Sequence, residues 1–375
     1  MPEGEHPTTP NLLRPVMPEL DSIRGIAILL VVFYHGLYIN LNETRLPHSA
    51  LIVFKLFWIG RLGVSLFFVL SGFLITGILV DSKGRPDYYS RFYARRAFRI
   101  LPAYFITIVI LVVFGIAPWK FIGMSLLYLS NLTPLFGIPI AYSVLWSLAV
   151  EEHFYFLWPI VVRNLKPLQV TKCCVIILAL SPLSRLLSFY LTTQDRLTAF
   201  RCNEYTWNSL DGLACGALFA IWLRSHNPSR KILQRAVLIL FISATAIEVI
   251  GLPWGILTRQ SPFGAAFQVV PWHLLFVTIL GSFLLLATSN WKGLVSLKFL
   301  RFFGEISYGL YLYHMLAYAA VDYLAKRASI SWTDTVWSYL TRFVVGASLA
   351  IGFAYFSRRT VEDYFLGLKQ RLTRA

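Results

Sequence analysis

The sequence predicts an all-α polytopic membrane protein with about ten transmembrane helices and one further short or re-entrant element. Hydrophobic residues make up 57% of the 375 residues and charged residues only 14%, a composition far more apolar than that of soluble domains. The 34 Lys and Arg residues outnumber the 18 Asp and Glu residues, and they gather at the ends of apolar runs. Such clusters mark cytosolic loops. The net charge of +16 therefore indicates an orientation in the lipid bilayer rather than nucleic-acid binding.

The chain is expected to have three parts. Residues 1–18 are polar and proline-rich, which is typical of a disordered cytosolic tail. Residues 19–357 form the transmembrane domain, and residues 358–375 form a basic cytosolic tail. No apolar core precedes residue 25, so we expect no cleavable signal peptide and insertion through the first span.

Apolar runs separated by polar or basic stretches predict the individual spans. We take the basic ends of these spans to be cytosolic. Both termini and residues 81–99 are then expected in the cytosol, and residues 42–49 and 326–335 outside. Pro, Gly and Asn interrupt residues 119–142, which must return to the face that they leave; they are predicted to form the short or re-entrant element. The ten predicted spans are residues 25–40, 57–80, 100–117, 143–162, 174–191, 205–222, 233–251, 269–288, 302–325 and 336–356.

The first span carries a histidine eleven residues after an arginine. At about 1.5 Å per residue, the helix advances roughly 16 Å from Arg24 to His35, about half the thickness of the hydrocarbon core. An ionisable group at that depth is costly unless it faces a polar cavity or a partner. His35 is therefore a candidate functional residue; the alternative is a neutral histidine that is hydrogen-bonded to a neighbouring helix.

Two adjacent glutamates lie at a similar depth in the fourth span. A carboxylate facing His35 would fix the imidazole tautomer and raise the basicity of the other ring nitrogen. Glu152 is the first choice for this role and Glu151 the second, because consecutive helical residues point about 100° apart. A buried ion pair that only joins two helices is an alternative. A zinc site formed with His153 is a further alternative, but HExxH-like ligand spacing is absent and no metal is expected.

Three arginines, Arg95, Arg96 and Arg99, precede the third span and share one surface if this stretch is helical. Guanidinium groups at this spacing suit a ligand with several phosphates on the cytosolic side. The alternative is that they only set the topology.

Five motifs, taken in order, resemble the acyltransferase-3 family of integral-membrane O-acyltransferases, whose members commonly O-acetylate bacterial surface carbohydrates. They are LDSIRGIAI at residues 20–28, FFVLSGFLI at 67–75, YARRAFRILPAY at 93–104, WSLAVEEHFYFLWP at 146–159 and ISYGLYLYH at 306–314. The resemblance covers most of the chain. We expect the chain to lack the extracytoplasmic hydrolase-like domain that some members carry.

The resemblance implies an acyl-CoA-dependent O-acyltransferase in the bacterial inner membrane, with acetyl-CoA as the expected donor. The acceptor would be a hydroxyl of a surface glycan or lipid-linked sugar at the extracytoplasmic face. His35 would act as the general base or carry the acyl group, oriented by Glu152 or Glu151. The residues expected to hold the phosphates of CoA are Arg24, Arg95, Arg96 and Arg99.

The alternative function is a proton-coupled transporter or flippase. In that case the intramembrane His and Glu residues would form a proton relay, and the arginines would only set the topology. Consumption of a thioester separates the two functions, because a transporter would move its solute without cleaving acetyl-CoA.

Overall fold

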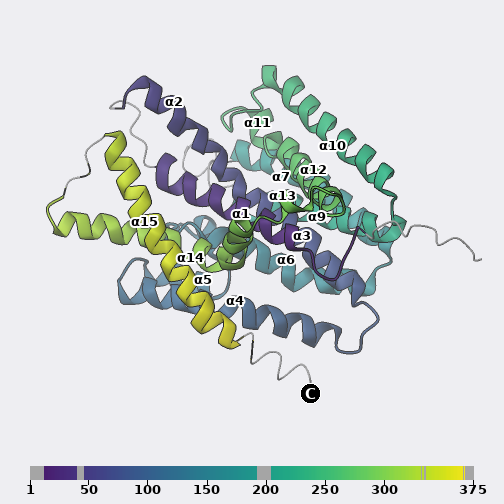
Figure 1. Cartoon of the computed structure of the whole chain (residues 1–375), viewed down its shortest axis with the longest axis horizontal. Helices are drawn as coiled ribbons and strands as arrows, with labels where there is room; N and C mark the ends of the chain where they lie inside the picture. Colours follow the sequence, from purple (N-terminus) through teal and green to yellow (C-terminus); the bar gives the residue numbers. More distant parts are fainter. Residues whose placement is uncertain are drawn as a thin grey trace, which may run out of the picture.

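The structure is a computed structural model that describes residues 12–39, 46–191, 204–330, 332, 335–365 and 367. Within these ranges the fold is helical and contains no strand, which confirms the predicted fold class (Figure 1). The longer helices are α1 (Pro18–Phe33), α2 (His48–Leu56), α3 (Gly63–Asp81), α4 (Tyr88–Val113), α5 (Trp119–Leu126), α6 (Leu145–Asn164), α7 (Pro167–Leu191), α9 (Thr206–His226), α10 (Arg230–Gly251), α12 (Val270–Ala287), α14 (Lys298–Arg327) and α15 (Val336–Ser357). The shorter elements are the π turn η1 (Tyr34–Tyr38), the 3₁₀ turns η2 (Phe57–Leu62), η3 (Ser130–Phe136) and η5 (Leu252–Trp254), the helices α11 (Pro262–Phe267) and α13 (Lys292–Val295), and the π turn η6 (Arg358–Glu362).

Each of the ten predicted spans coincides with a long helix. Within the described part of the chain, seven helical stretches are long and apolar enough to cross a membrane. The helices α6, α9 and α14 fall outside this group and carry acidic residues in their interiors, together with a histidine in α6 and in α14. The protein is therefore a multi-pass membrane protein, and the count of ten spans stays a prediction.

Two boundaries differ from the prediction. The loop predicted over residues 81–99 ends early, because α4 begins at Tyr88 and carries the three arginines on its first turns. The second span starts before residue 57, since α2, η2 and α3 form one helical stretch from His48 to Asp81 with a 3₁₀ turn in its middle. Residues 119–142 contain two short helical elements, α5 and η3, where a short or re-entrant element was predicted.

The predicted tails are partly built into the helical domain. Residues 1–11 lie outside the described residues, but Leu12 is buried and Arg14 pairs with the buried side chain of Glu19. At the other end, η6 adds a further turn after α15, and its Glu362 is buried. Leu12 and Glu362 thus pack against the helical domain, and the division into three parts at residues 18 and 358 stays a prediction.

Glycines bring the central helices into close contact. A Cβ added at Gly25 of α1 would lie 2.0 Å from the carbonyl oxygen of Leu300, and one at Gly304 of α14 would lie 2.0 Å from that of Asp21. Any side chain at either position would push the two backbones apart. The two helices therefore lie against each other along the first span, near the centre of the molecule (Figure 1).

A second close contact joins α3 and α9. A Cβ at Gly72 would lie 1.9 Å from the carbonyl oxygen of Leu213, and one at Gly216 would lie 1.9 Å from that of Val69. This agrees with the close helix approach that small residues in a membrane helix favour.

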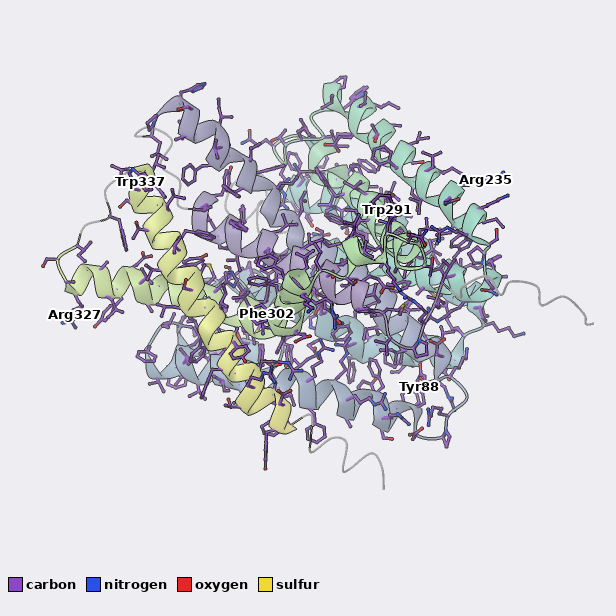
Figure 2. The ribbon with its side chains drawn as sticks, viewed as in Figure 1. Tyr88, Arg235, Trp291, Phe302, Arg327 and Trp337 are labelled. Atoms are coloured by element: carbon purple, nitrogen blue, oxygen red, sulfur yellow. The ribbon has the colours of Figure 1, made fainter. Side chains whose placement is uncertain are left out.

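Two pairs of residues near helix ends can be compared with the predicted topology. Figure 2 shows Tyr88 and Arg235, both predicted to be inside, towards the right of the molecule. Arg327, predicted to be outside, and Trp337, at the outer end of the last predicted span, lie towards the left in the same figure. Which of these two sides is cytosolic stays a prediction.

Candidate active site

A cavity of about 800 Å³ lies between α1, α3, α4, α6 and α14. The four arginines that the sequence singled out all line it. The charged residues of its lining are Asp21, Arg24, Asp81, Arg85, Arg91, Arg95, Arg96, Arg99, Glu151, Glu305, Arg358 and Glu362. The structure thus brings together residues from the first span, the start of α4 and the turn that follows α15.

Three cavity-lining arginines of α4 form no direct ion pair with the residues that the structure describes. Arg24 donates a hydrogen bond to Asp21 over 2.8 Å, and so its charge is partly paired. In contrast, no ion pair within the described ranges involves Arg95, Arg96 or Arg99. The guanidinium of Arg96 lies 3.9 Å from the ring centre of Tyr155. Like charges held on one helix face repel one another, so an anionic ligand in this cavity would be favoured.

The inner part of the cavity is polar. Ser71 of α3 donates a hydrogen bond to Glu151 over 2.8 Å, and the hydroxyls of Ser147 and Tyr311 lie 2.5 Å apart. Glu151 lines the cavity and Glu152 does not. Only one of the two adjacent carboxylates faces the cavity, as their angular separation predicts. It is Glu151, the second choice of the sequence analysis.

His35 lies on the π turn η1 and faces a second histidine. Its Nδ1 is 2.9 Å from the carbonyl oxygen of Val31 and 3.3 Å from Nε2 of His314. Nδ1 of His314 is 2.8 Å from the carbonyl oxygen of Tyr311. A carbonyl can only accept a hydrogen bond, so both Nδ1 atoms carry the proton in the neutral state. This assignment, inferred from the acceptors, leaves Nε2 of His35 with its lone pair available.

The partner of His35 is therefore not the one predicted. No hydrogen bond within the described part of the chain joins His35 to Glu151 or Glu152. The close contact of α1 and α14 instead brings His314 against it. Neither histidine lines the arginine cavity, but Tyr311, which does, supplies the carbonyl that fixes His314. The cavity thus ends one helical turn from the histidine pair.

Tyr318 of α14 supports the turn that carries His35. Its hydroxyl donates to the carbonyl oxygen of Val32 over 3.2 Å, and its ring lies where a side chain at Gly36 would stand. Arg342 of α15 forms two hydrogen bonds to Asp322, of 2.6 and 2.7 Å, and lies over the Tyr318 ring. π turns inside α-helices are frequent at functional sites.

His314 received no role from sequence patterns alone. The available signal was its position at the end of the fifth motif, residues 306–314. Nothing in the local sequence indicates which helix it faces. His153, the third ligand of the zinc alternative, contacts Thr206 over 2.7 Å. Among the residues that the structure describes, no three His, Cys, Asp or Glu side chains are grouped as a metal site.

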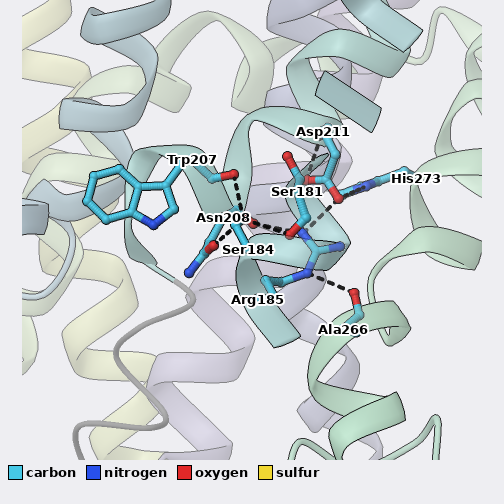
Figure 3. A network of polar contacts seen from close by, with 9 residues as sticks. Ser181, Ser184, Arg185, Trp207, Asn208, Asp211, Ala266 and His273 are labelled. Atoms are coloured by element: carbon cyan, nitrogen blue, oxygen red, sulfur yellow. Dashed lines mark hydrogen bonds and ion pairs between the residues drawn. The ribbon is translucent and has the colours of Figure 1, made fainter. Parts of the chain in front are cut away.

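A separate polar network joins four other helices. Figure 3 shows Arg185 of α7, Asp211 of α9 and His273 of α12 close together. Arg185 donates to Asp211 over 2.8 Å and to the carbonyl oxygen of Ala266 over 2.9 Å, and Nδ1 of His273 lies 3.5 Å from Asp211. These three charged or ionisable side chains are all buried. A buried ion pair of this kind holds helices in register.

Residues 17–359 match a family model described as an acyltransferase domain. The chain belongs to the acyltransferase-3 family. This match covers most of the chain and confirms the resemblance found in the five motifs.

Three relatives illustrate the family. The chain is 28% identical to the peptidoglycan O-acetyltransferase OatA of Listeria monocytogenes over 82% of its own length and 50% of that protein. It is 25% identical to the O-acetyltransferase OatA of Staphylococcus aureus over 80% of its length and 50% of that protein. It is 34% identical to the putative peptidoglycan O-acetyltransferase YrhL of Bacillus subtilis, over 38% of its length and 23% of that protein. The chain spans about half the length of the first and second of these relatives. No solved structure matches it.

Proposed function

We propose that this acyltransferase-3 protein transfers an acetyl group from acetyl-CoA to a carbohydrate hydroxyl. The observation that carries the proposal is the cavity lined by Arg24, Arg95, Arg96 and Arg99, which ends one helical turn from the histidine pair. CoA carries several phosphates, and unpaired guanidinium groups are the protein groups that bind phosphate best. The volume of about 800 Å³ is within the range of cofactor sites.

In the proposed reaction, Nε2 of His35 removes the proton of the acceptor hydroxyl. The acceptor oxygen attacks the thioester carbonyl, the bond from that carbon to sulfur breaks, and the CoA thiolate leaves and takes up a proton. The products are the acetyl ester and free CoA. His314, whose Nε2 accepts from Nδ1 of His35, stabilises the imidazolium that forms. It takes over the orienting role that the sequence analysis gave to Glu152.

Two further roles complete the proposal. Glu151 lines the cavity, so it acts on the donor side, while Glu152 makes no contact with the cavity or with His35. Nε2 of His35 is also the atom that would carry the acetyl group if transfer went through an acyl-enzyme. Trapping of an acetylated His35 without acceptor separates the two routes.

The acceptor is proposed to be a surface glycan or lipid-linked sugar outside the cytoplasmic membrane. Two relatives are named as peptidoglycan O-acetyltransferases, one of them putatively, which supports a glycan acceptor. The basic residues support cytosolic termini and a cytosolic arginine cavity. Single-cysteine labelling tests this orientation. A cysteine at Lys83 that reacts with an impermeant reagent from outside intact cells would overturn it.

The central test is acetyl transfer by the purified protein. The wild type is expected to turn over acetyl-CoA repeatedly only when a glycan acceptor is supplied. His35→Ala should lower the rate by a factor of about 100 or more, since a positioned general base typically contributes that much. Expression, thermal stability and CoA binding should remain near wild type, because His35 does not line the donor cavity. Appreciable transfer by His35→Ala would refute the mechanism. Solute movement by the wild type without thioester cleavage would instead favour a transporter.

A further inference from the structure

Two other arginines converge on one amide oxygen, away from the donor cavity. Arg61 of η2 and Arg259, from the segment between η5 and α11, donate to Oε1 of Gln268 over 3.4 and 3.2 Å. The amide nitrogen of this buried glutamine donates to the carbonyl oxygen of Leu257 over 2.6 Å. That contact fixes Oε1 towards the arginines. Two positive charges from distant parts of the sequence therefore meet at one point.

The edge of the Arg61 guanidinium that carries Nε and Nη2 forms no hydrogen bond within the described part of the chain. Its Nε and Nη2 atoms are buried and have no hydrogen-bond partner. In Arg224 and Arg342 of the same chain, the same two nitrogens donate hydrogen bonds to the two carboxylate oxygens of an aspartate. No ion pair of Arg61 occurs among the described residues. Unpaired buried donors are costly, and a bidentate oxyanion is the group whose geometry satisfies both.

Nearby carboxylates do not fill this edge. Glu248 is close enough for its charge to act on Arg61, but no hydrogen bond or ion pair joins them, and Oε2 of Glu248 is itself buried without a partner. The charge of Glu204 acts on Arg259. The Arg61 guanidinium lies 3.8 Å from the ring centre of Trp58. Because the edge is closed to solvent, an incoming anion has to displace side chains that cover it.

The arginine pair lies beside the turn that carries His35. A Cβ added at Gly60 would lie 2.2 Å from the carbonyl oxygen of Leu30 and 2.8 Å from Cβ of Tyr34. The ring of Tyr34 meets that of His35 edge-on, with centres 5.0 Å apart. Arg61 is not part of the donor cavity lining. A ligand held by Arg61 would thus approach His35 separately from the donor.

We propose that Arg61 and Arg259 bind an oxyanion of the acceptor and so present its hydroxyl to His35. This inference rests on the proposed acetyl transfer. The oxyanion is either a carboxylate on the sugar or a phosphate of a lipid carrier, since both offer two oxygens to the guanidinium edge.

Three acceptors distinguish whether the bound oxyanion is a carboxylate on the sugar or a phosphate of the lipid carrier. The first is a disaccharide that bears one carboxylate, and the second is the same disaccharide with a neutral amide in place of the carboxylate. The third is the neutral disaccharide linked through a diphosphate to an isoprenoid lipid. Acceptor KM, acetyl-CoA KM and kcat are measured for each acceptor with the full-length protein in detergent.

The variants are Arg61→Gln, Arg61→Lys and Arg259→Gln, with Arg327→Gln as the matched control. Arg327 is exposed at the end of α14 and donates only to Tyr323 among the described residues. Arg61→Gln is expected to raise the KM of an anionic acceptor by about 10- to 100-fold. Arg61→Lys should have a smaller effect, because it keeps the charge and loses the paired donors. The acetyl-CoA KM should not change in either variant.

A rise in KM confined to the carboxylate acceptor shows that the bound oxyanion belongs to the sugar. A rise confined to the diphosphate acceptor shows that it belongs to the lipid carrier. An equal penalty on all three acceptors, or none with folded protein, overturns the proposal. Calorimetry of the carboxylate disaccharide with wild type and Arg61→Lys gives a readout that needs no catalysis. If the wild type turns over acetyl-CoA repeatedly with no acceptor, the proposed transfer fails, and the calorimetric difference still decides whether the arginines bind an anion.

Discussion

The arginines of this protein occur in two contrasting settings. Arg185 is buried between α7, α9 and α12, and it is held by Asp211 and two backbone carbonyls. Arg95, Arg96 and Arg99 share one end of α4, line a large cavity and have no ion pair among the described residues. The first group is neutralised by the protein itself. The second group has carboxylates such as Glu151 and Glu362 nearby but forms no direct ion pair with them in the described part of the chain.

This difference separates a structural role from a binding role. A paired, buried charge contributes to the arrangement of helices, because removing one partner leaves the other unsatisfied. Unpaired charges in a cavity destabilise the fold slightly through repulsion, and a ligand of opposite charge offsets that cost. The comparison can be tested by removing charges one at a time in each setting.

The largest effect on stability is expected from Asp211→Ala. It leaves Arg185 buried without its carboxylate, which typically costs about 3–5 kcal/mol. A fluorescence-detected thermal melt in detergent should show a strongly lowered midpoint or no folded protein. Replacing both residues, as Arg185→Met with Asp211→Leu, should recover most of the loss. A melting temperature for Asp211→Ala equal to that of the wild type would show that this network does not stabilise the fold.

The next effect concerns binding. Arg96→Gln and Arg99→Gln should each weaken acetyl-CoA binding by about 1.5–3 kcal/mol, the usual strength of a charge-assisted contact. Thermal stability should be unchanged or slightly higher, because like charges are removed. Calorimetry and thermal melts measure the two quantities on the same samples. Unchanged CoA affinity in well-folded protein would mean that these arginines only set the topology.

A smaller effect is expected for the histidine pair. His314→Gln should lower kcat by about tenfold, equivalent to one hydrogen bond to His35, with unchanged acetyl-CoA KM. The pH dependence of kcat should also shift, because the stabiliser of the His35 imidazolium is lost. A merely structural role would leave the pH profile as it is. Tyr323→Phe, on the same helix, is the control.

The smallest effect is expected for an exposed ion pair. Arg224 forms two hydrogen bonds of 2.8 Å to Asp81, whose side chain is 61% exposed. Exposed pairs contribute about 0–1 kcal/mol, so Asp81→Asn should barely shift the melting temperature. A loss comparable to that of Asp211→Ala would show that burial is not what distinguishes the two arginine settings.

Sequence alone determined the features that depend on the bilayer and on neighbours along the chain. Apolar runs and basic ends predicted the helices, since partition into lipid and hydrogen bonding within a helix are local properties. The five motifs gave the family. The spacing of residues 95, 96 and 99 predicted one cationic surface, because a helix fixes the directions of residues three and four apart.

Only the tertiary structure decided which side chains face one another. His35 and His314 are 279 residues apart, and they meet because Gly25 and Gly304 let α1 and α14 approach closely. The choice between Glu151 and Glu152 likewise depended on the rotation of α6 against its neighbours. The lack of hydrogen-bond partners at Nε and Nη2 of Arg61 likewise depends on how the 3₁₀ turn η2 packs against its neighbours. Such contacts arise from the packing of several helices at once, and no local pattern in one helix specifies its rotation against another.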